Sequence, residues 1–151
     1  MISEHISKKE ATFSATATRR GIDNTPGEYE LQNMELIAEK VFEPLRKYVN
    51  GPIKINSFYR SEELNKAIGG SSRSQHCQGR AMDLDDTYGY MSNADMYNYI
   101  KDNLDFDQMI WEFGTEENPD WVHVSYVDAD SNRKRCLQAY KEDGKTKYKV
   151  I

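Results

Sequence analysis

The feature that most constrains this chain is the stretch from Ser74 to Asp83, Ser-Gln-His-Cys-Gln-Gly-Arg-Ala-Met-Asp. It contains His76 and Asp83, and Gly79 between them permits a tight backbone path. A second fragment, Asp-Trp-Val-His, ends at His123. Two imidazoles and a carboxylate can together ligate a metal ion. The fold is therefore expected to bring these two separate segments together.

These residues predict a zinc site with hydrolytic chemistry. A catalytic zinc usually takes three protein ligands and keeps a fourth position for water, and His76, Asp83 and His123 meet that count. A bound zinc lowers the pKa of water toward neutrality, so that hydroxide can attack a carbonyl. We expect Asp120, at the mouth of the strand that carries His123, to act as the general base. Glu112, on the preceding strand, is the alternative base.

Other roles for these residues stay open on spacing alone. A single histidine is more often a surface or hydrogen-bonded group than a metal ligand. Asp83 could cap a turn, and Asp120 follows Asn-Pro, where turn residues are common. Cys77 could be a ligand, but beside His76 it is expected to pack as a small apolar side chain. A closed structural zinc site is disfavoured because no fourth protein ligand can be assigned.

Most of the expected helices lie in the first half of the chain. The strongest pattern covers residues 31–45, where apolar residues recur at three- and four-residue steps. Pro44 is expected to end or kink this helix. Shorter helices are predicted from the capping-box sequence at residues 7–10, over 62–68 after Ser61, and over 92–103 after Ser92.

Strands are predicted over residues 53–58, 80–85, 107–113, 121–127, 136–140 and 146–150. The short connection at 114–119 predicts an antiparallel hairpin, and a second hairpin closes around Asp143-Gly144. Because side chains alternate along a strand, Asp83 and His123 can point to one sheet face, with His76 entering from a loop. Early helices and sequence-adjacent strand pairs indicate an α+β fold. We expect residues 1–151 to form a single small domain with a central, mainly antiparallel sheet and helices packed on it.

Composition excludes several classes of protein. The chain has 151 residues, 38% hydrophobic and 30% charged, as in a soluble globular protein, and its net charge of −5 gives no case for nucleic-acid binding. No apolar run has the length of a signal peptide or a membrane span, so we expect no membrane insertion and either synthesis in the cytoplasm without a signal peptide or a mature form whose leader is missing. A monomer is expected. Whether Cys77 and Cys136 form a disulfide stays open.

The ordered motifs resemble those of the D-alanyl-D-alanine metallopeptidases. The resemblance rests on Ser74-x-His-x-x-Gly-x-Ala-x-Asp83 followed by Asp120-x-x-His123, and the segments 21–26, 57–65 and 108–112 are also similar to the family. It spans about residues 10 to 127. The family includes zinc DD-carboxypeptidases, D-Ala-D-Ala dipeptidases and phage L-alanyl-D-glutamate endolysins, and it shares a small α+β fold with the hedgehog signalling domain.

The resemblance implies that His76, Asp83 and His123 bind Zn²⁺ and that Asp120 is the base. Glu112 stays a rival base, because in this branch the residue three positions before the last histidine is not uniformly acidic. Arg60 is implied as the partner of a substrate carboxylate or an oxyanion, although a surface ion pair with a neighbouring glutamate is an alternative role.

The implied activity is cleavage of the peptide stems of bacterial peptidoglycan, as carboxypeptidase or as endolysin-type endopeptidase. A phage-type or prophage-type lysin that reaches the cell wall after release is the expected setting. The alternative from another class is a zinc-containing binding module of the same fold that does not catalyse a reaction.

Overall fold

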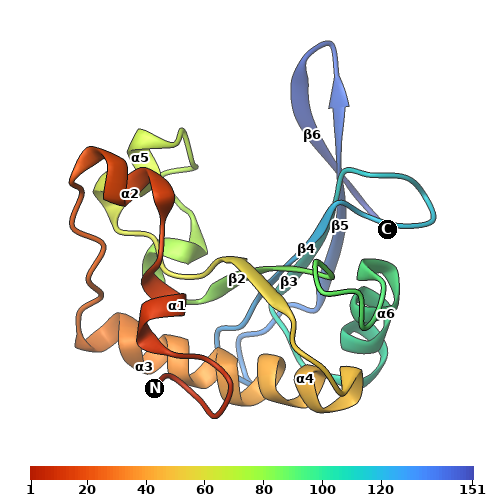
Figure 1. Ribbon diagram of the computed structural model, residues 1–151. Helices are drawn as coiled ribbons and strands as arrows, with labels where there is room; N and C mark the ends of the chain where they lie inside the picture. Colours follow the sequence, from red (N-terminus) through yellow and green to blue (C-terminus); the bar gives the residue numbers. More distant parts are fainter.

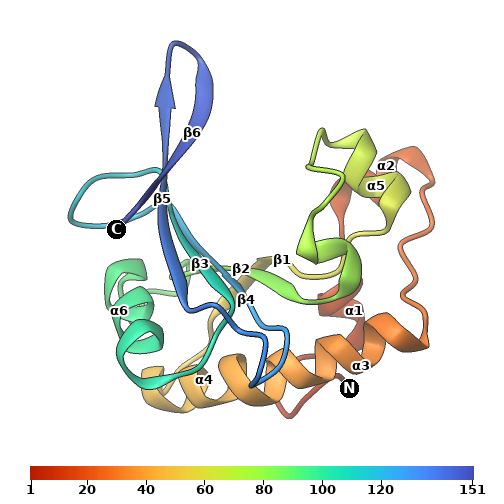
Figure 2. The same cartoon turned by 180° about the vertical axis from the view of Figure 1, so that it is seen from behind.

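The computed structural model describes residues 1–151 and confirms an α+β fold (Figures 1 and 2). Six strands form one sheet in the order β1-β2-β4-β3-β5-β6. Every neighbouring pair is antiparallel except β3 and β5, which are parallel. The predicted mainly antiparallel sheet is therefore confirmed.

The helices begin where the sequence offers a capping serine. Ser7, Ser14, Ser61 and Ser92 each accept a hydrogen bond from the backbone N–H three residues on, which satisfies one free donor of the first turn. One of these helices, α2, was not predicted. The helical segments are α1 (Lys8–Thr12), α2 (Ala15–Arg20), α3 (Glu28–Ile37), the π-helical turn η1 (Ala38–Phe42), α4 (Glu43–Val49), α5 (Glu62–Ala67), the 3₁₀ turn η2 (Gln75–Gln78) and α6 (Asn93–Asn103).

Pro44 does not end the long helix. The segments α3, η1 and α4 follow one another without a break, and the chain leaves the helix only at Asn50, whose φ of 57° is left-handed. Proline has no N–H to donate to the carbonyl four residues back. The turn before it is wider, and the Glu43 N–H donates to the Ala38 carbonyl five residues back. The helix therefore does not end near Pro44 but changes there, over one turn, from α-helical to π-helical hydrogen bonding.

The strands are β1 (Lys54–Ser57), β2 (Ala81–Asp85), β3 (Gln108–Glu112), β4 (Trp121–Ser125), β5 (Arg135–Glu142) and β6 (Lys145–Val150). The two predicted hairpins, β3–β4 and β5–β6, are confirmed. The sequence-adjacent pairs are joined by two contacts that were not predicted, the antiparallel β2–β4 pair and the parallel β3–β5 pair.

The sheet has one buried face and one face that is partly open. Alternate residues along β2, β3 and β4 belong to the main core, which also includes residues of the long helix and α6: Met82, Leu84, Met109, Trp111, Val122 and Val124. The residues between them, including Asp83, Ile110 and His123, belong to the opposite face. Polar side chains on that second face can therefore serve chemistry without entering the main core.

The β5–β6 hairpin extends away from the rest of the molecule (Figures 1 and 2), and all six residues of β6 are exposed. None of the helices is both long and apolar enough to cross a membrane. Cys77 and Cys136 are free thiols and form no disulfide.

Candidate metal centre

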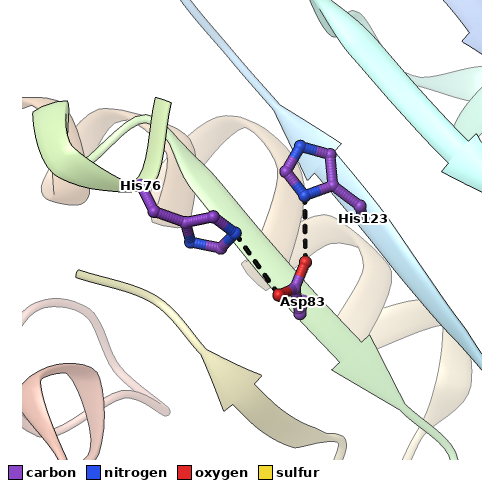
Figure 3. Close-up of side chains that lie close together, drawn as sticks. All are labelled: His76, Asp83 and His123. Atoms are coloured by element: carbon purple, nitrogen blue, oxygen red, sulfur yellow. Dashed lines mark hydrogen bonds and ion pairs between the residues drawn. The ribbon is translucent and has the colours of Figure 1, made fainter. Parts of the chain in front are cut away.

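Three different elements bring His76, Asp83 and His123 together, as Figure 3 shows. Asp83 on β2 and His123 on β4 are direct partners in the antiparallel register. The His123 Nδ1 lies 2.9 Å from one Asp83 oxygen, and the His76 Nε2 lies 3.3 Å from the other. The structure thus assembles the three predicted ligands into one cluster.

His76 lies on the 3₁₀ turn η2, and not on the irregular loop that we expected. The Ser74 hydroxyl caps this turn by accepting from the His76 N–H at 3.2 Å. Gly79 ends it with a left-handed φ of 72°. A Cβ at position 79 would lie 2.5 Å from the Glu30 carbonyl of α3, so both conformation and space require glycine there.

The hydrogen bonds of His76 fit a metal ligand. Its Nδ1 lies 2.7 Å from the Phe58 carbonyl, which can only accept, so Nδ1 carries the proton and Nε2 keeps a lone pair. Nε2 is buried and has no hydrogen-bond partner. This lone pair therefore faces the Asp83 carboxylate, and two acceptors at that distance repel each other unless a cation lies between them. Ligand atoms of a tetrahedral zinc are about 3.3 Å apart for bonds of about 2.0–2.2 Å, so the spacing suits zinc.

The electrostatics favour the protonation states that a metal requires. Burial lowers the pKa of His76, so its imidazole is neutral. Burial opposes the charge of Asp83, but the positive charge that His76 or His123 carries when protonated, together with the hydrogen bond from His123, holds the pKa of this carboxyl well below its usual range. Metal ligands must be a neutral histidine and an ionised carboxylate, and this cluster supplies both.

The cluster lies in a cavity of about 880 Å³. One wall is the segment that follows α5, from Gly69 to Gln75, and another is the β5–β6 hairpin. Figure 2 shows the hairpin at the upper left and α5, with the segment that follows it, at the upper right. The remaining lining includes Arg60, Glu112, Phe113 and Trp121. A peptide would thus have room beside the metal ligands.

Glu112 reaches this cavity from β3. It pairs with Trp121 in the sheet, and Trp121 lies two residues before His123, so Glu112 is on the same face as the metal ligands. Its residue exposure is only 8%. Burial raises the pKa of Glu112 to about 7, although His123 acts in the opposite direction. A carboxyl with a pKa near neutrality can both accept and donate a proton.

Asp120 is placed differently. It is exposed and is not among the residues that line the cavity. It lies one residue before β4 begins, outside the ladder that carries His123. Its backbone N–H donates to the Glu112 carbonyl at 2.9 Å, and its carbonyl accepts from the Asn93 side chain at 3.1 Å. The structure therefore brings Glu112, and not Asp120, to the metal cluster.

Arg60 lies in the cavity wall beside His76. Its backbone N–H donates to the His76 carbonyl at 3.2 Å, and its Nη2 donates to the Ser74 hydroxyl at 3.4 Å. Its Nε is buried and has no partner, and Arg60 forms no ion pair with Glu62 or Glu63. Burial lowers the pKa of Arg60, but a guanidinium stays charged. The cavity thus contains a cation with unused donors.

Sequence reasoning missed Asn24, which holds the backbone on both sides of Arg60. Its Nδ2 donates to the Tyr59 carbonyl at 3.1 Å, and its Oδ1 accepts from the Ser61 N–H at 2.7 Å. A third bond joins Nδ2 to the Thr12 carbonyl at 2.8 Å. The signal was the family-like segment 21–26, in which no single residue was selected.

A His-Asp-His cluster in an open cavity, with a buried carboxylate beside it, is the kind of site that metal-dependent hydrolases use. The Peptidase M15 family model matches residues 4–125, and the chain belongs to this family. The resemblance to the D-alanyl-D-alanine metallopeptidases is thereby confirmed. No curated protein matches the chain. The matched residues end with β4, so the β5–β6 hairpin lies beyond them.

Proposed function

We propose that residues 1–151 form one zinc-dependent peptidase domain that cleaves the peptide stems of bacterial peptidoglycan. The observation that carries this proposal is the joint presence, in one cavity, of the His-Asp-His cluster, the buried Glu112 and Arg60, which forms no ion pair. The family match supports peptidase activity.

Zinc held by His76, Asp83 and His123 would supply Lewis acidity toward a carbonyl and activate water for attack. Glu112 takes the proton of the attacking water and passes it to the leaving amine, because it is the buried carboxylate on the metal face. This choice replaces Asp120, the first candidate from the sequence, and it rests on where the two side chains lie.

Arg60 binds a carboxylate of the substrate or the oxyanion that forms during attack. Its forked donors suit either group, and Arg60 lines the cavity without forming an ion pair. Because peptidoglycan lies outside the cytoplasmic membrane, the domain would act on the cell wall after release, as a phage-type lysin does.

The test is zymography on purified peptidoglycan, with mass analysis of the products, for the wild type, Glu112→Gln and Asp120→Asn. We expect chelator-sensitive cleavage that falls at least about a hundredfold in Glu112→Gln and at most a few-fold in Asp120→Asn. Both variants should bind one zinc, measured by metal analysis. The product masses identify the bond, D-Ala-D-Ala or L-Ala-D-Glu.

Loss of activity in Asp120→Asn alone would show that the base is Asp120. If zinc-loaded wild type cleaves no peptidoglycan, the second candidate gains support, a binding module of the same fold that does not catalyse a reaction. The two carboxamide variants are matched in chemistry, so the comparison isolates position.

A further inference from the structure

The β5–β6 hairpin forms part of the cavity, although it lies outside the family-matched residues. In the sheet register Glu112 pairs with Ala139 of β5, and Ala139 pairs with Tyr148 of β6. These residues therefore share the metal face. Two residues further toward the tip, Lys141 pairs with Thr146 on that same face. Lys141, Thr146 and Tyr148 all line the cavity that holds the metal cluster.

Lys141 is the hairpin cation that faces this cavity. Its ammonium donates to the Thr146 hydroxyl at 2.8 Å and lies 5.5 Å from the centre of the Phe113 ring. No carboxylate lies within ion-pair distance of it. Lys147, on the opposite face of the same hairpin, has such a partner in Glu142 at 3.4 Å. The inward lysine is thus held in place but its charge is not neutralised.

The charges of the cavity are arranged for an anionic ligand. Its carboxylates, Asp83 and Glu112, belong to the metal centre. Arg133 is neutralised by two hydrogen bonds to Asp107, whereas Lys141 on one wall and Arg60 on another have no carboxylate partner apart from the metal-site residues. Since the whole chain carries a net charge of −5, an anionic peptide needs such local cations to enter.

We propose that Lys141 is a specificity-determining residue that binds a carboxylate of an acidic peptide substrate. This inference rests on the proposed function of the same cavity and adds to it the class of substrate. The position of Lys141, on the projecting part of β5 beyond the level of Glu112, sets the recognised carboxylate apart from the scissile bond. Arg60, beside His76, is available to the reacting end of the peptide.

The test uses two synthetic stem peptides that differ in one group. In the first the glutamate carries a free α-carboxylate, and in the second that carboxylate is amidated. Steady-state cleavage is measured with zinc-loaded wild type, Lys141→Met, Lys141→Arg and the control Lys147→Met, which removes the same charge from the other face. Binding of both peptides is measured by calorimetry on zinc-loaded Glu112→Gln, alone and combined with each lysine variant.

We expect Lys141→Met to raise KM for the acidic peptide roughly three- to tenfold with kcat nearly unchanged, and to leave the amidated peptide unaffected. Lys141→Arg should restore most of the preference, and Lys147→Met should behave as wild type. The binding constants should change in parallel. An equal effect of Lys141→Met on both peptides, or no effect, overturns the proposal.

The binding arm separates the two proposals. If wild type cleaves neither peptide but binding of the acidic peptide depends on Lys141, the peptidase function fails and the carboxylate site stands. If neither peptide binds, the carboxylate site is refuted, whatever the zymogram shows.

Discussion

The burial of Glu112 in the candidate site makes the stability of the fold depend on pH. A carboxylate loses water when it is buried, and the pKa of Glu112 rises from 4.5 to about 7 for that reason. The folded state therefore holds a proton that the unfolded state has already lost between about pH 4.5 and pH 7. Stability falls as the pH rises through this window.

We predict that Glu112→Gln stabilises the metal-free protein at pH 8, by an amount on the order of 1–3 kcal/mol, because glutamine has no charge to bury. The gain should shrink toward zero at pH 4, where Glu112 is protonated in both states. Urea unfolding in the presence of a chelator measures both values. Glu117→Gln, on an exposed loop, is the control and should change little at either pH. A gain that is the same at pH 4 and pH 8 would contradict this account.

The residues of the candidate site differ in how well they could be predicted from the sequence. The cluster of His76, Asp83 and His123 was predicted from the sequence because histidines are rare in this chain and the three residues have a recognisable spacing. The preference for Asp120 over Glu112 as the general base was less secure, because it depends on which face of the sheet each side chain points to. Asp120 lies just before β4 begins, so alternation along that strand does not fix its direction, and the pairing of Glu112 with Trp121 is a matter of register that no local residue specifies.

At the scale of elements, the turn between β1 and α5 is held by side chains from other parts of the chain. Asn24 makes all three of its hydrogen bonds to backbone groups, two of them on either side of Arg60. Its exposure is 9%, so removal of the amide leaves buried backbone groups without partners. Arg60 then loses the support that sets its direction.

We predict that Asn24→Ala lowers the free energy of unfolding by about 2–4 kcal/mol, since three hydrogen bonds are lost in a buried setting. In the folded variant, KM for a stem peptide should rise, while zinc content stays at that of wild type. Asn24→Asp keeps the acceptor for the Ser61 N–H but turns a carboxylate oxygen toward the Thr12 and Tyr59 carbonyls, so at neutral pH it should destabilise the fold at least as much as Asn24→Ala. Denaturant titration, metal analysis and steady-state kinetics supply the three readouts. A stability loss with unchanged KM would show that Asn24 has no part in placing Arg60.

The elements that local patterns define were predicted well, and their long-range pairing was not. Apolar periodicity gave the long helix, and a serine before each of α1, α5 and α6 marked its start. The parallel β3–β5 contact joins segments that are not neighbours in the chain, and nothing in either strand selects the other. The π-helical turn before Pro44 was not predicted. A proline in the sequence shows that one backbone donor is missing, but it does not show how the helix changes its hydrogen bonding in response.

At the scale of the whole molecule, the three ligands link η2, β2 and β4. Without a metal, the lone pair of His76 and the Asp83 carboxylate oppose each other inside the structure. A zinc ion held by these groups would bind the folded chain, in which they are assembled, far better than the unfolded one. Its binding energy therefore adds to the stability of the fold.

We predict that a chelator lowers Tm by about 10 °C relative to protein with free zinc near a thousandfold excess over Kd. The difference should vanish in His76→Ala. Cys77→Ala is the control that keeps the shift, because Cys77 is next to His76 in sequence but outside the metal cluster. Calorimetric melting with and without chelator gives the comparison. A zinc-dependent shift that survives in His76→Ala would place the metal elsewhere.

The projecting hairpin has a further consequence for how copies of the chain meet. Strand β6 is the last in the sheet, so one row of its backbone groups has no neighbour. Such a free edge can recruit strands from other molecules and begin aggregation. Here Lys145, Lys147 and Lys149 occur at every second position of β6, so two such edges would bring rows of like charge together. The lysines of this strand thus protect an exposed edge from pairing with another copy of itself.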